Sequence, residues 1–275
     1  MSAACADIVQ RDDPRLWKTA LFAPEPARSR LMVLYAFDCE LSRAARASSE
    51  SLIPRMRLQW WRDAIEEAAS GGSPKAHEVA GPLAGLIQSV LGVEGAVDLD
   101  AMAQAREKEL DAPLDQEDYL FWHKFRYGGL VSAASRCLCA DCEKEDDWSP
   151  PIVSAAMGAD YAIRTAQRSA SKNKPLIRDG LDGASLRALA RGELTRPARD
   201  LFQNLAREGL EELSRASAEW VKKDPRLLPA LLPLVRIERV LGAASAPDFD
   251  LQCLERIDRP FDGLRLAWRA MRGRW

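Results

Sequence analysis

The chain has 275 residues, of which 47% are hydrophobic and 29% are charged, with a formal net charge of −2 and a pI of about 5.9. This length is enough for one large globular core or two modest ones. The near-neutral charge excludes a global basic field for nucleic acid. Glycine and proline, at 16 each, give no collagen-like or disordered bias.

The termini and the cysteines indicate the compartment. The first residues lack a basic start followed by an apolar run, so we expect no signal peptide. No uninterrupted apolar stretch approaches the roughly 20 residues of a membrane-spanning helix. Six cysteines are sparse for this length, and their spacing does not indicate a disulfide framework, which favours a reducing compartment. We therefore expect a soluble cytoplasmic protein, or one attached peripherally at the inner face of the membrane.

The first strongly periodic segment begins near residue 31. Leu31, Leu34, Leu41 and Ala45 recur at three- to four-residue steps, with Phe37 beside them, which predicts a helix with one buried face.

The next helix is expected over residues 51–69, with Leu52, Met56, Trp60 and Ala64 on its buried face. Ser51 is a candidate cap at its start, and the glycine pair at 71–72 ends it.

The rest of the chain is also helical in pattern. Loops are expected at 70–82, 141–151 and 173–183, where Gly, Ser, Pro or charged residues cluster. Helices are expected at 83–91, 98–110, 116–139, 152–169, 186–191, 197–222, 227–241 and 251–272. Alternating strand patterns are almost absent. Residues 1–275 are therefore predicted to form a single all-α domain of roughly ten helices, with a split near the 141–151 loop as the alternative.

Two early motifs carry a family resemblance. Residues 31–37 read LMVLYAF, and residues 57–64 read RLQWWRDA. Two adjacent tryptophans in a basic helix are uncommon, and together the motifs resemble the opening helices of the squalene/phytoene synthase superfamily. The likeness covers residues 14–242, strongly at the start and weakly after about residue 110. It implies an isoprenoid (trans-prenyltransferase) synthase-like helical bundle around a central cavity, whereas the structural alternative is an ordinary amphipathic helix pair.

The resemblance also implies chemistry that this chain does not carry. Superfamily members that form carbon–carbon bonds hold Mg²⁺ with two acidic DxxxD motifs. Here the first place reads Ser42 to Arg46, and the second reads Ser169 to Asn173. Serine and asparagine are poor Mg²⁺ ligands. The repulsion between an arginine and the ion at close range is on the order of several kcal/mol. We therefore expect no catalytic residue, no metal ligand and no cofactor.

Within the superfamily the chain resembles a divergent branch that typically lacks the acidic pairs. The branch includes the mitochondrial assembly factor for respiratory complex I and its alphaproteobacterial relatives. Its members share a short LFAP stretch, found here at residues 21–24, ahead of the LYAF and RLQWWRD segments. The resemblance implies a respiratory-complex subunit or an isoprenoid or lipid ligand as partner.

A basic stripe replaces the acids. Arg164, Arg168 and Lys172 lie at successive four-residue steps, and Arg43 and Arg46 face them if the bundle forms. The functional interpretation is a metal-free anion site for a lipid phosphate or diphosphate. The structural alternative is a solvated face or salt bridges to acids such as Asp38. The candidate cavity and anion-binding residues are Ser42, Arg46, Arg57, Gln59, Trp60, Arg164, Arg168, Ser169 and Lys172.

Relocated carboxylates give the catalytic alternative. If Asp38, Asp63 or Asp160 lined the cavity and bound Mg²⁺, the chain would be an active prenyl transferase that condenses isoprenoid diphosphates, as phytoene or squalene synthase does.

The cysteines and histidines offer weaker candidates for chemistry. Cys137, Cys139 and Cys142 are the one metal-like cluster in the sequence, but it lacks a second ligand pair, and buried apolar cysteines are the alternative that we favour. His77 falls in a loop. His123 lies in an aromatic helix and is expected to be an interfacial side chain rather than a base.

The C-terminal segment, residues 264–275, is basic and carries two tryptophans. This composition suits the edge of an anionic membrane or a partner groove. The alternative is a final helix that packs Leu264, Trp268 and Met271 onto the core. The residues expected at a membrane are Arg265, Trp268, Arg269, Arg272 and Trp275.

Overall fold

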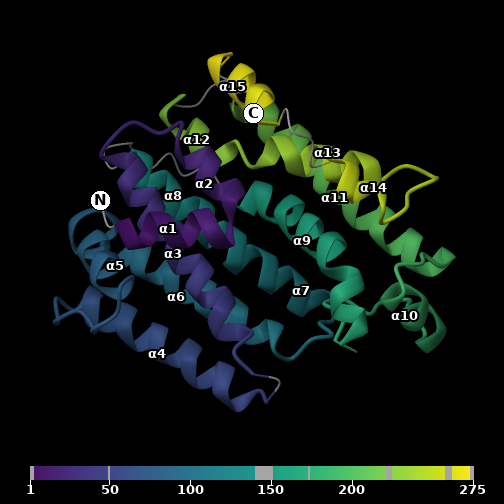
Figure 1. The fold of residues 1–275 in the computed structure, drawn as a ribbon, viewed down its shortest axis with the longest axis horizontal. Coiled ribbons are helices and arrows are strands. Elements are labelled where there is room, and N and C mark those ends of the chain that lie inside the picture. Colours follow the sequence, from purple (N-terminus) through teal and green to yellow (C-terminus); the bar gives the residue numbers. More distant parts are fainter. Residues whose placement is uncertain are drawn as a thin grey trace.

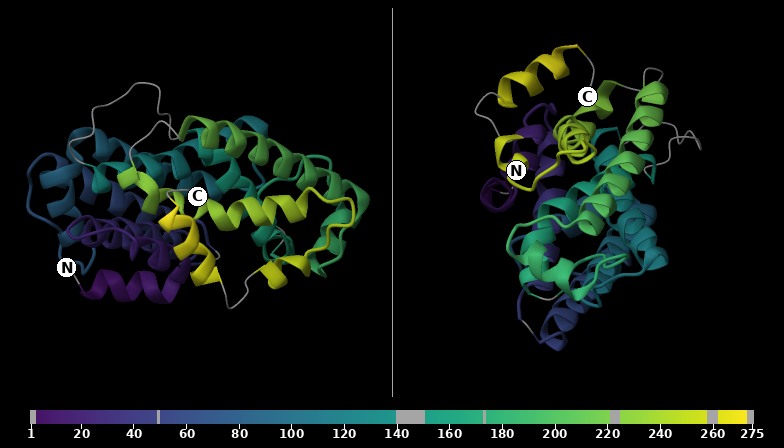
Figure 2. Two further views of the ribbon diagram at one scale, coloured as in Figure 1. Left: turned by 90° about the horizontal axis from the view of Figure 1, so that it is seen from above. Right: turned by 90° about the vertical axis from the view of Figure 1, so that its right-hand side faces the viewer.

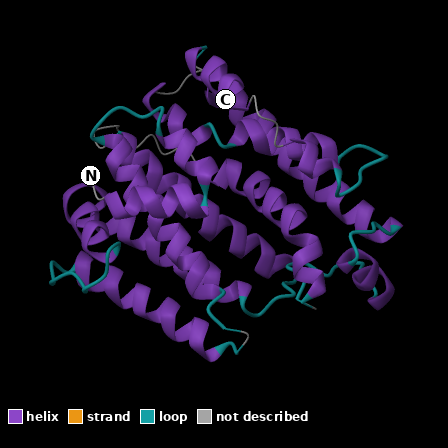
Figure 3. Cartoon of the chain, in the orientation of Figure 1, coloured by secondary structure: helices purple, strands orange, loops and turns teal. Residues whose placement is uncertain are grey.

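The computed structural model describes residues 3–48, 50–139, 151–172, 174–220, 225–257 and 262–272. Helices make up the regular structure of these ranges, apart from one isolated parallel bridge between Leu114 and Ile177 (Figure 3). The all-α prediction is confirmed.

The helices follow one another with short connections. They are α1 (Ala3–Asp12), α2 (Pro14–Ala20), α3 (Ala27–Ala45), α4 (Leu52–Ala69), α5 (Ala80–Leu86), π-helical η1 (Ile87–Leu91), α6 (Gly92–Glu109), α7 (Gln116–His123), π-helical η2 (Lys124–Gly128), α8 (Gly129–Leu138), α9 (Pro151–Ser171), α10 (Gly183–Ala190), α11 (Arg196–Trp220), 3₁₀-helical η3 (Pro225–Leu227), α12 (Leu228–Leu231), α13 (Leu234–Ala244), α14 (Cys253–Ile257) and α15 (Asp262–Met271).

Two inner helices organise the bundle. In Figure 1, α4 runs along one edge and α10 lies at the opposite end, with α3 and α9 between them. α3 packs against α1, α4 and α8, whereas α9 packs against α10, α11 and α13. The two views in Figure 2 show α1 on the outside of the bundle and α15 across the same side. The layout places residues from both halves of the chain around the interior of the bundle.

Aspartate caps begin several of these helices. Asp13 accepts hydrogen bonds from the backbone N–H groups of Arg15 and Leu16, both at 3.1 Å, and Pro14 occupies the first turn of α2. Asp115 and Asp182 cap α7 and α10 in the same way. Neither α1 nor α2 was predicted from the periodicity, although the Asp–Pro pair at α2 is a helix-start signal.

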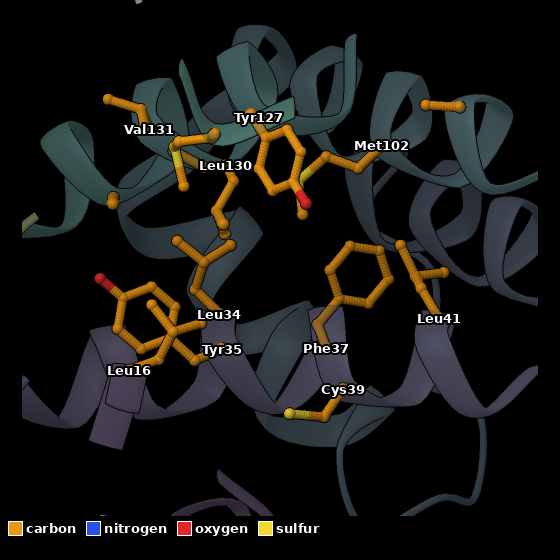
Figure 4. Packing of buried hydrophobic residues seen from close by; sticks show 14 of the residues in the cluster. Leu16, Leu34, Tyr35, Phe37, Cys39, Leu41, Met102, Tyr127, Leu130 and Val131 are labelled. Atoms are coloured by element: carbon orange, nitrogen blue, oxygen red, sulfur yellow. The ribbon is translucent and has the colours of Figure 1, made fainter. Parts of the chain in front are cut away.

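The two sequence motifs, residues 31–37 on α3 and 57–64 on α4, contribute to the core, but the buried face of α4 differs from the predicted one. Phe37 of α3 meets Trp61 of α4 edge to face, with ring centroids 5.4 Å apart, and both rings are buried. Figure 4 shows Phe37 and the other apolar side chains of α3 beneath Tyr127 and Leu130. The predicted buried face of α4 was wrong, since Leu52 and Met56 are 67% and 64% exposed. The buried stripe instead holds Leu58, Trp61, Ile65 and Ala68.

The ends of α4 agree only partly with the sequence prediction. Ser51 stands at the N-cap, but its side chain makes no capping hydrogen bond. At the other end, Gly71 adopts φ +78°, a left-handed conformation that suits glycine after a helix. The predicted end of this helix is therefore confirmed.

One helical run is long enough and apolar enough to cross a membrane by length and composition. It covers 30 residues, Ala80–Glu109, with a mean hydropathy of 1.3 over its best window, and 44% of that window is buried in the protein. Gly92, at φ +64°, interrupts the run between η1 and α6. The expectation that no apolar stretch approaches this length was therefore too strict, although a buried core helix meets the same criterion.

The C-terminal helix predicted over residues 251–272 is present as two shorter helices, α14 and α15; residues 258–261, between them, lie outside the described ranges. On α15, Leu266 and Ala270 pack against the core, whereas Trp268 and Met271 are 47% and 79% exposed. The alternative that packs Trp268 and Met271 inward was therefore wrong.

Replacing Gly129 with alanine should destabilise the fold where α6 and α8 cross. An added Cβ would lie 2.8 Å from the backbone carbonyl oxygen of Asp98, and a backbone atom moves less readily than a side chain. We expect a loss of about 1–3 kcal/mol in the free energy of unfolding, measured by urea denaturation. Gly85→Ala is the control, because its Cβ would meet no atom within 4 Å and alanine favours helix by up to about 1 kcal/mol. Equal losses in the two variants would contradict this account.

Candidate functional site

A cavity of about 890 Å³ lies between the N-terminal helices, η2, α9 and α13. Its volume is within the range of roughly 300–1,000 Å³ that is usual for small-molecule sites. The lining combines apolar and charged side chains. The apolar part includes Leu16, Leu130, Met157, Leu232, Val235, Ile237 and Leu266. The central cavity implied by the family resemblance is therefore present.

The charged part of the lining is predominantly basic. Among the described residues, eight basic and four acidic side chains line the cavity, an excess of four formal positive charges, even though the whole chain carries −2. The basic residues are Arg15, Lys18, Arg46, Arg126, Arg164, Arg168, Arg236 and Arg239, and the acidic residues are Asp12, Asp13, Asp38 and Asp160. The sign of the local field favours an anionic ligand.

The place of the first acidic motif is occupied by a buried ion pair. Ser42 and Arg46, at the end of α3, both line the cavity. Behind them, Arg106 of α6 donates hydrogen bonds to the Ser42 hydroxyl and, at 3.4 Å, to the Asp38 carboxylate. The side chain of Arg106 is 3% exposed and that of Asp38 is 12% exposed. The carboxylate of Asp38 therefore lines the cavity as one member of an ion pair with Arg106.

Glu109 extends this pairing into a network. It lies 3.1 Å from Arg106 and 3.9 Å from Arg126, and it accepts a hydrogen bond of 2.5 Å from the Tyr161 hydroxyl. Burial alone would raise the pKa of Glu109, but the charges of Arg106 and Arg126 outweigh burial and hold the pKa below its usual value. The Arg126 guanidinium also stacks over Tyr161, 4.2 Å from the ring centroid. Glu109 is therefore an anion that the network neutralises.

The basic stripe on α9 separates into paired and unpaired members. Arg164 donates to Asp160 at 2.8 Å, and Arg236 of α13 lies 3.7 Å from the same carboxylate. Burial would lower the pKa of Arg164, but Asp160 raises it above its ordinary value. Arg168, one turn further, lines the cavity, is exposed and makes no ion pair with another described residue. The salt-bridge alternative thus holds for Arg164, although with Asp160 rather than Asp38.

A second, smaller pocket adjoins the cavity. It has a volume of about 130 Å³ and shares Arg46, Tyr161, Thr165 and Arg168 with the larger cavity. The remaining lining is Glu109, Ala112, Ser169, Lys172, Lys174 and Leu176. The helix α9 ends at Ser171, so Lys172 lies just beyond it rather than on its face.

Three candidates from the double-tryptophan motif lie elsewhere. Arg57, Gln59 and Trp60 are not among the described residues that line either pocket, so their assignment to the cavity was wrong. Gln59 is exposed and donates to Asp63, whereas Trp60 packs against Trp61 with ring centroids 5.0 Å apart. Trp61 of the same motif packs against Phe37 of α3, and Arg62 pairs with Asp100 of α6 at 2.7 Å, so the motif attaches α4 to the bundle.

Arg43 also lies outside the two linings. Its ion pair with Asp12, at 2.6 Å, connects α3 to α1, whereas its pair with Glu40, at 2.5 Å, lies within α3. Of the two arginines expected to face the basic stripe, only Arg46 does so.

The cysteine cluster does not supply three thiolates. Cys137 is a buried free thiol, Cys139 is disulfide-bonded, and Cys142 lies outside the described residues. A sulfur in a disulfide cannot act as a thiolate ligand. Burial lowers the pKa of His123 to about 4, and its ring accepts or donates a bond of 3.1 Å to Ser154, so it is neutral at pH 7.

Several lining residues were missed by the sequence analysis. Asp12, Asp13 and Lys18 come from α1 and α2, which the periodicity did not indicate, and Arg236 and Arg239 come from α13. A step of three residues places these last two on one face of α13. The three-residue spacing was visible in the sequence, but the sequence did not indicate that this face of α13 packs toward α9.

The donor set does not fit a magnesium site. Mg²⁺ is usually held by one or two carboxylates together with phosphate oxygens. Of the carboxylates that line the larger cavity, Asp12 pairs with Arg43, Asp38 with Arg106 and Asp160 with Arg164, while Asp13 caps α2. Within the described part of the chain, no three His, Cys, Asp or Glu side chains are grouped as metal ligands. We derive no step through a metal ion.

Comparisons with known proteins agree with this picture. The family model for squalene/phytoene synthase matches residues 9–134. The human and bovine proteins called NADH dehydrogenase (ubiquinone) complex I, assembly factor 6 are each 23% identical, over 262 and 254 residues. Both alignments cover 90% of this chain and 74% of the relative.

Solved structures show the same fold. A dehydrosqualene synthase in complex with a ligand matches with a TM-score of 0.79 at 12% identity, over 98% of this chain and 95% of that structure. A squalene synthase from Alicyclobacillus acidocaldarius matches with a TM-score of 0.66 at 16% identity, over 88% and 92%. The predicted resemblance in sequence and in fold is confirmed.

Replacing Arg106 with methionine should destabilise the protein strongly. The change keeps an unbranched side chain, but it leaves Asp38 buried without its counter-ion and removes one of the two guanidinium groups beside Glu109. We expect a loss of about 3–5 kcal/mol in the free energy of unfolding at pH 7, measured in urea. The matched control is Arg191→Met, because Arg191 and Glu193 form an ion pair in which both side chains are about 60% exposed. The control should change by less than about 1 kcal/mol, and a similar effect in both variants would contradict the structural role of Arg106.

Proposed function

We propose that this chain, whose residues 9–134 belong to the squalene/phytoene synthase family, is a non-catalytic member that acts as an assembly-type factor for respiratory complex I. The relatives named as complex I assembly factors support the second part of the proposal. The first part rests on one observation, which is that the cavity's carboxylates are occupied by arginines or a helix cap.

The physical argument concerns the leaving group. Expelling diphosphate from an allylic carbon needs concentrated positive charge on its oxygens. Arg106 and Arg164 are neutralised by Asp38 and Asp160, whereas Arg46 and Arg168 are exposed to water and form no ion pair with another described residue. A charge pair 4 Å apart is worth only about 1 kcal/mol in water, against about 4 kcal/mol near a protein surface. Under this proposal the chain binds or scaffolds without a metal cofactor.

A deletion strain separates the proposal from the catalytic alternative. Loss of the gene should lower the amount of assembled complex I, measured on native gels and by NADH oxidation in membranes, and should leave isoprenoid products unchanged. Reintroducing the wild-type gene is the control. In parallel, the purified protein should release no pyrophosphate from farnesyl or geranylgeranyl diphosphate with Mg²⁺. Pyrophosphate release, or loss of an isoprenoid product in the strain, would favour a prenyl transferase instead.

The exposed face of α15 supports a peripheral membrane location. Trp268 and Met271 are 47% and 79% exposed, and the Arg272 guanidinium lies 4.0 Å from the Trp268 ring centroid. Arg269 pairs with Glu238 at 3.5 Å. The Arg265 side chain and Trp275, the other two residues expected there, lie outside the described part of the chain. A tryptophan beside a cation suits an interface with anionic lipid.

The double substitution Trp268→Ala with Met271→Ala should weaken binding to vesicles that contain anionic lipid. We expect a decrease of about tenfold in cosedimentation affinity, equivalent to about 1.4 kcal/mol, since both side chains lose apolar surface that would enter the interface. The control is Val93→Ala with Val97→Ala on α6, a pair that is 69% and 64% exposed. Equal binding by the two double variants would argue against α15 as the contact.

A further inference from the structure

We propose that the outer face of α4 binds a cationic amphipathic helix of a partner protein. The α4 face comprises the exposed side chains of this helix, which runs along one edge of the bundle (Figure 1). They are Leu52, Ile53, Met56, Arg57, Gln59, Asp63, Glu66 and Glu67. None of them is among the described residues that line either pocket, so this interaction is independent of what the cavity binds.

The first half of the α4 face is apolar. Leu52, Ile53 and Met56 are 67%, 41% and 64% exposed. Leu52 and Met56 lie one turn apart, so their side chains are neighbours on the helix surface. Apolar positions at this spacing are the anchors with which amphipathic helices bind their partners, and methionine adapts to varied surfaces. The described part of the chain leaves these anchors largely open to solvent.

The rest of α4 prevents this half from turning inward. The opposite side of the helix carries Trp61, which is 3% exposed. Toward α6, Arg55 lies 2.5 Å from Asp111 and Arg62 lies 2.7 Å from Asp100. A rotation that buried the apolar anchors would break both ion pairs and expose the indole ring. The apolar half therefore faces outward in the folded protein.

The second half of the α4 face is acidic. Asp63, Glu66 and Glu67 are exposed, and none of the three forms an ion pair with another described residue. Arg57 is the one exposed cation of the α4 face, so one positive and three negative charges leave a net negative charge. The apolar residues all precede Arg57 and the acidic residues all follow Gln59, which makes the two halves distinct.

Helix stability does not account for this charge pattern. The macrodipole of a helix favours anions in the first turn and cations in the last turn. Glu66 and Glu67 lie in the last turn of α4, which holds no basic residue, and the first turn holds no acidic residue. Both ends of the helix therefore lack the charge that would stabilise them. Cations supplied by a partner would compensate the acidic end.

Neither a second copy of this chain nor an anionic membrane complements the α4 face. In a parallel pair of α4 helices the acidic halves would meet, and in an antiparallel pair each acidic half would meet an apolar half. An anionic membrane would repel Asp63, Glu66 and Glu67. A partner helix with apolar residues in one half and lysine or arginine in the other complements both halves at once.

The dimensions of the α4 face set the length of the partner helix. The distance along the helix axis from Leu52 to Glu67 is about 22 Å, at a rise of about 1.5 Å per residue. A partner helix of about four turns therefore reaches from the apolar end to the acidic end.

Fluorescence anisotropy of labelled peptides, titrated with the purified protein, tests the proposal. The first probe is a designed helical peptide of about 16 residues, with leucines one turn apart in one half and lysines in the other. In the second probe every lysine is replaced by glutamate, and the third is a scrambled sequence of the first. We expect the first peptide to bind at least about tenfold more tightly than the other two. Added salt should weaken its binding.

Leu52→Gln with Met56→Gln should weaken binding of the cationic peptide about tenfold, because the anchors lose their apolar contact. Glutamine keeps a high helix propensity and both positions are exposed, so the thermal midpoint of unfolding should not change. The matched control is Trp268→Gln with Met271→Gln on α15, a pair that is also exposed and should bind as the wild type does.

Glu66→Gln with Glu67→Gln should also weaken binding about tenfold and should reduce its dependence on salt. The control is Glu208→Gln with Glu211→Gln on α11, which removes the same charge from two other exposed carboxylates. The control pair should bind the cationic peptide as the wild type does.

The inference is overturned if the cationic peptide binds no more tightly than the acidic or the scrambled peptide. Equal weakening by either control pair would also overturn it, since the effect would then be one of general hydrophobicity or net charge. Analytical ultracentrifugation tests for a second copy: a wild-type dimer that Leu52→Gln with Met56→Gln converts to a monomer would refute the proposed occupant. Binding to anionic vesicles that the same variant abolishes would refute it in favour of a membrane.

Discussion

The Arg106 guanidinium is a permanent positive charge in the interior, and the surrounding helices supply groups that compensate it. Asp38 and Ser42 come from α3 and Glu109 from α6. Burying a charge without a partner costs several kcal/mol, so loss of any one of these charged groups would leave its partner buried and uncompensated. The wall of the cavity at Ser42 and Asp38 is consequently built around a fixed cation.

This pairing determines the electrostatic sign of the cavity. Arg106 neutralises Asp38 and, with Arg126, Glu109. The arginines and lysines at the junction of the two pockets, which pair with no other described residue, therefore dominate the local field. Asp160 is compensated in the same way by Arg164 and Arg236. The net charge of the described cavity lining is therefore positive, and the surface attracts anions.

Much of the fold followed from local patterns. Periodicity predicted the helices around Phe37, Trp61 and Trp122, and the glycine at position 71 predicted the end of α4. Periodicity was ambiguous where a helix carries apolar residues on two faces. On α4 it indicated the face of Met56, although the face of Trp61 packs against α3, because the choice depends on the neighbouring helix.

The sequence by itself determined the helical class, the resemblance to squalene/phytoene synthases and the absence of acidic pairs at Ser42 and Ser169, because each of these is a property of residue type and spacing. Only the tertiary structure decided which cations are free. Arg164 and Arg168 lie one turn apart and both line the cavity, yet Arg164 pairs with Asp160 and Arg168 pairs with no other described residue. Charge pairing across helices depends on distances that no local pattern encodes.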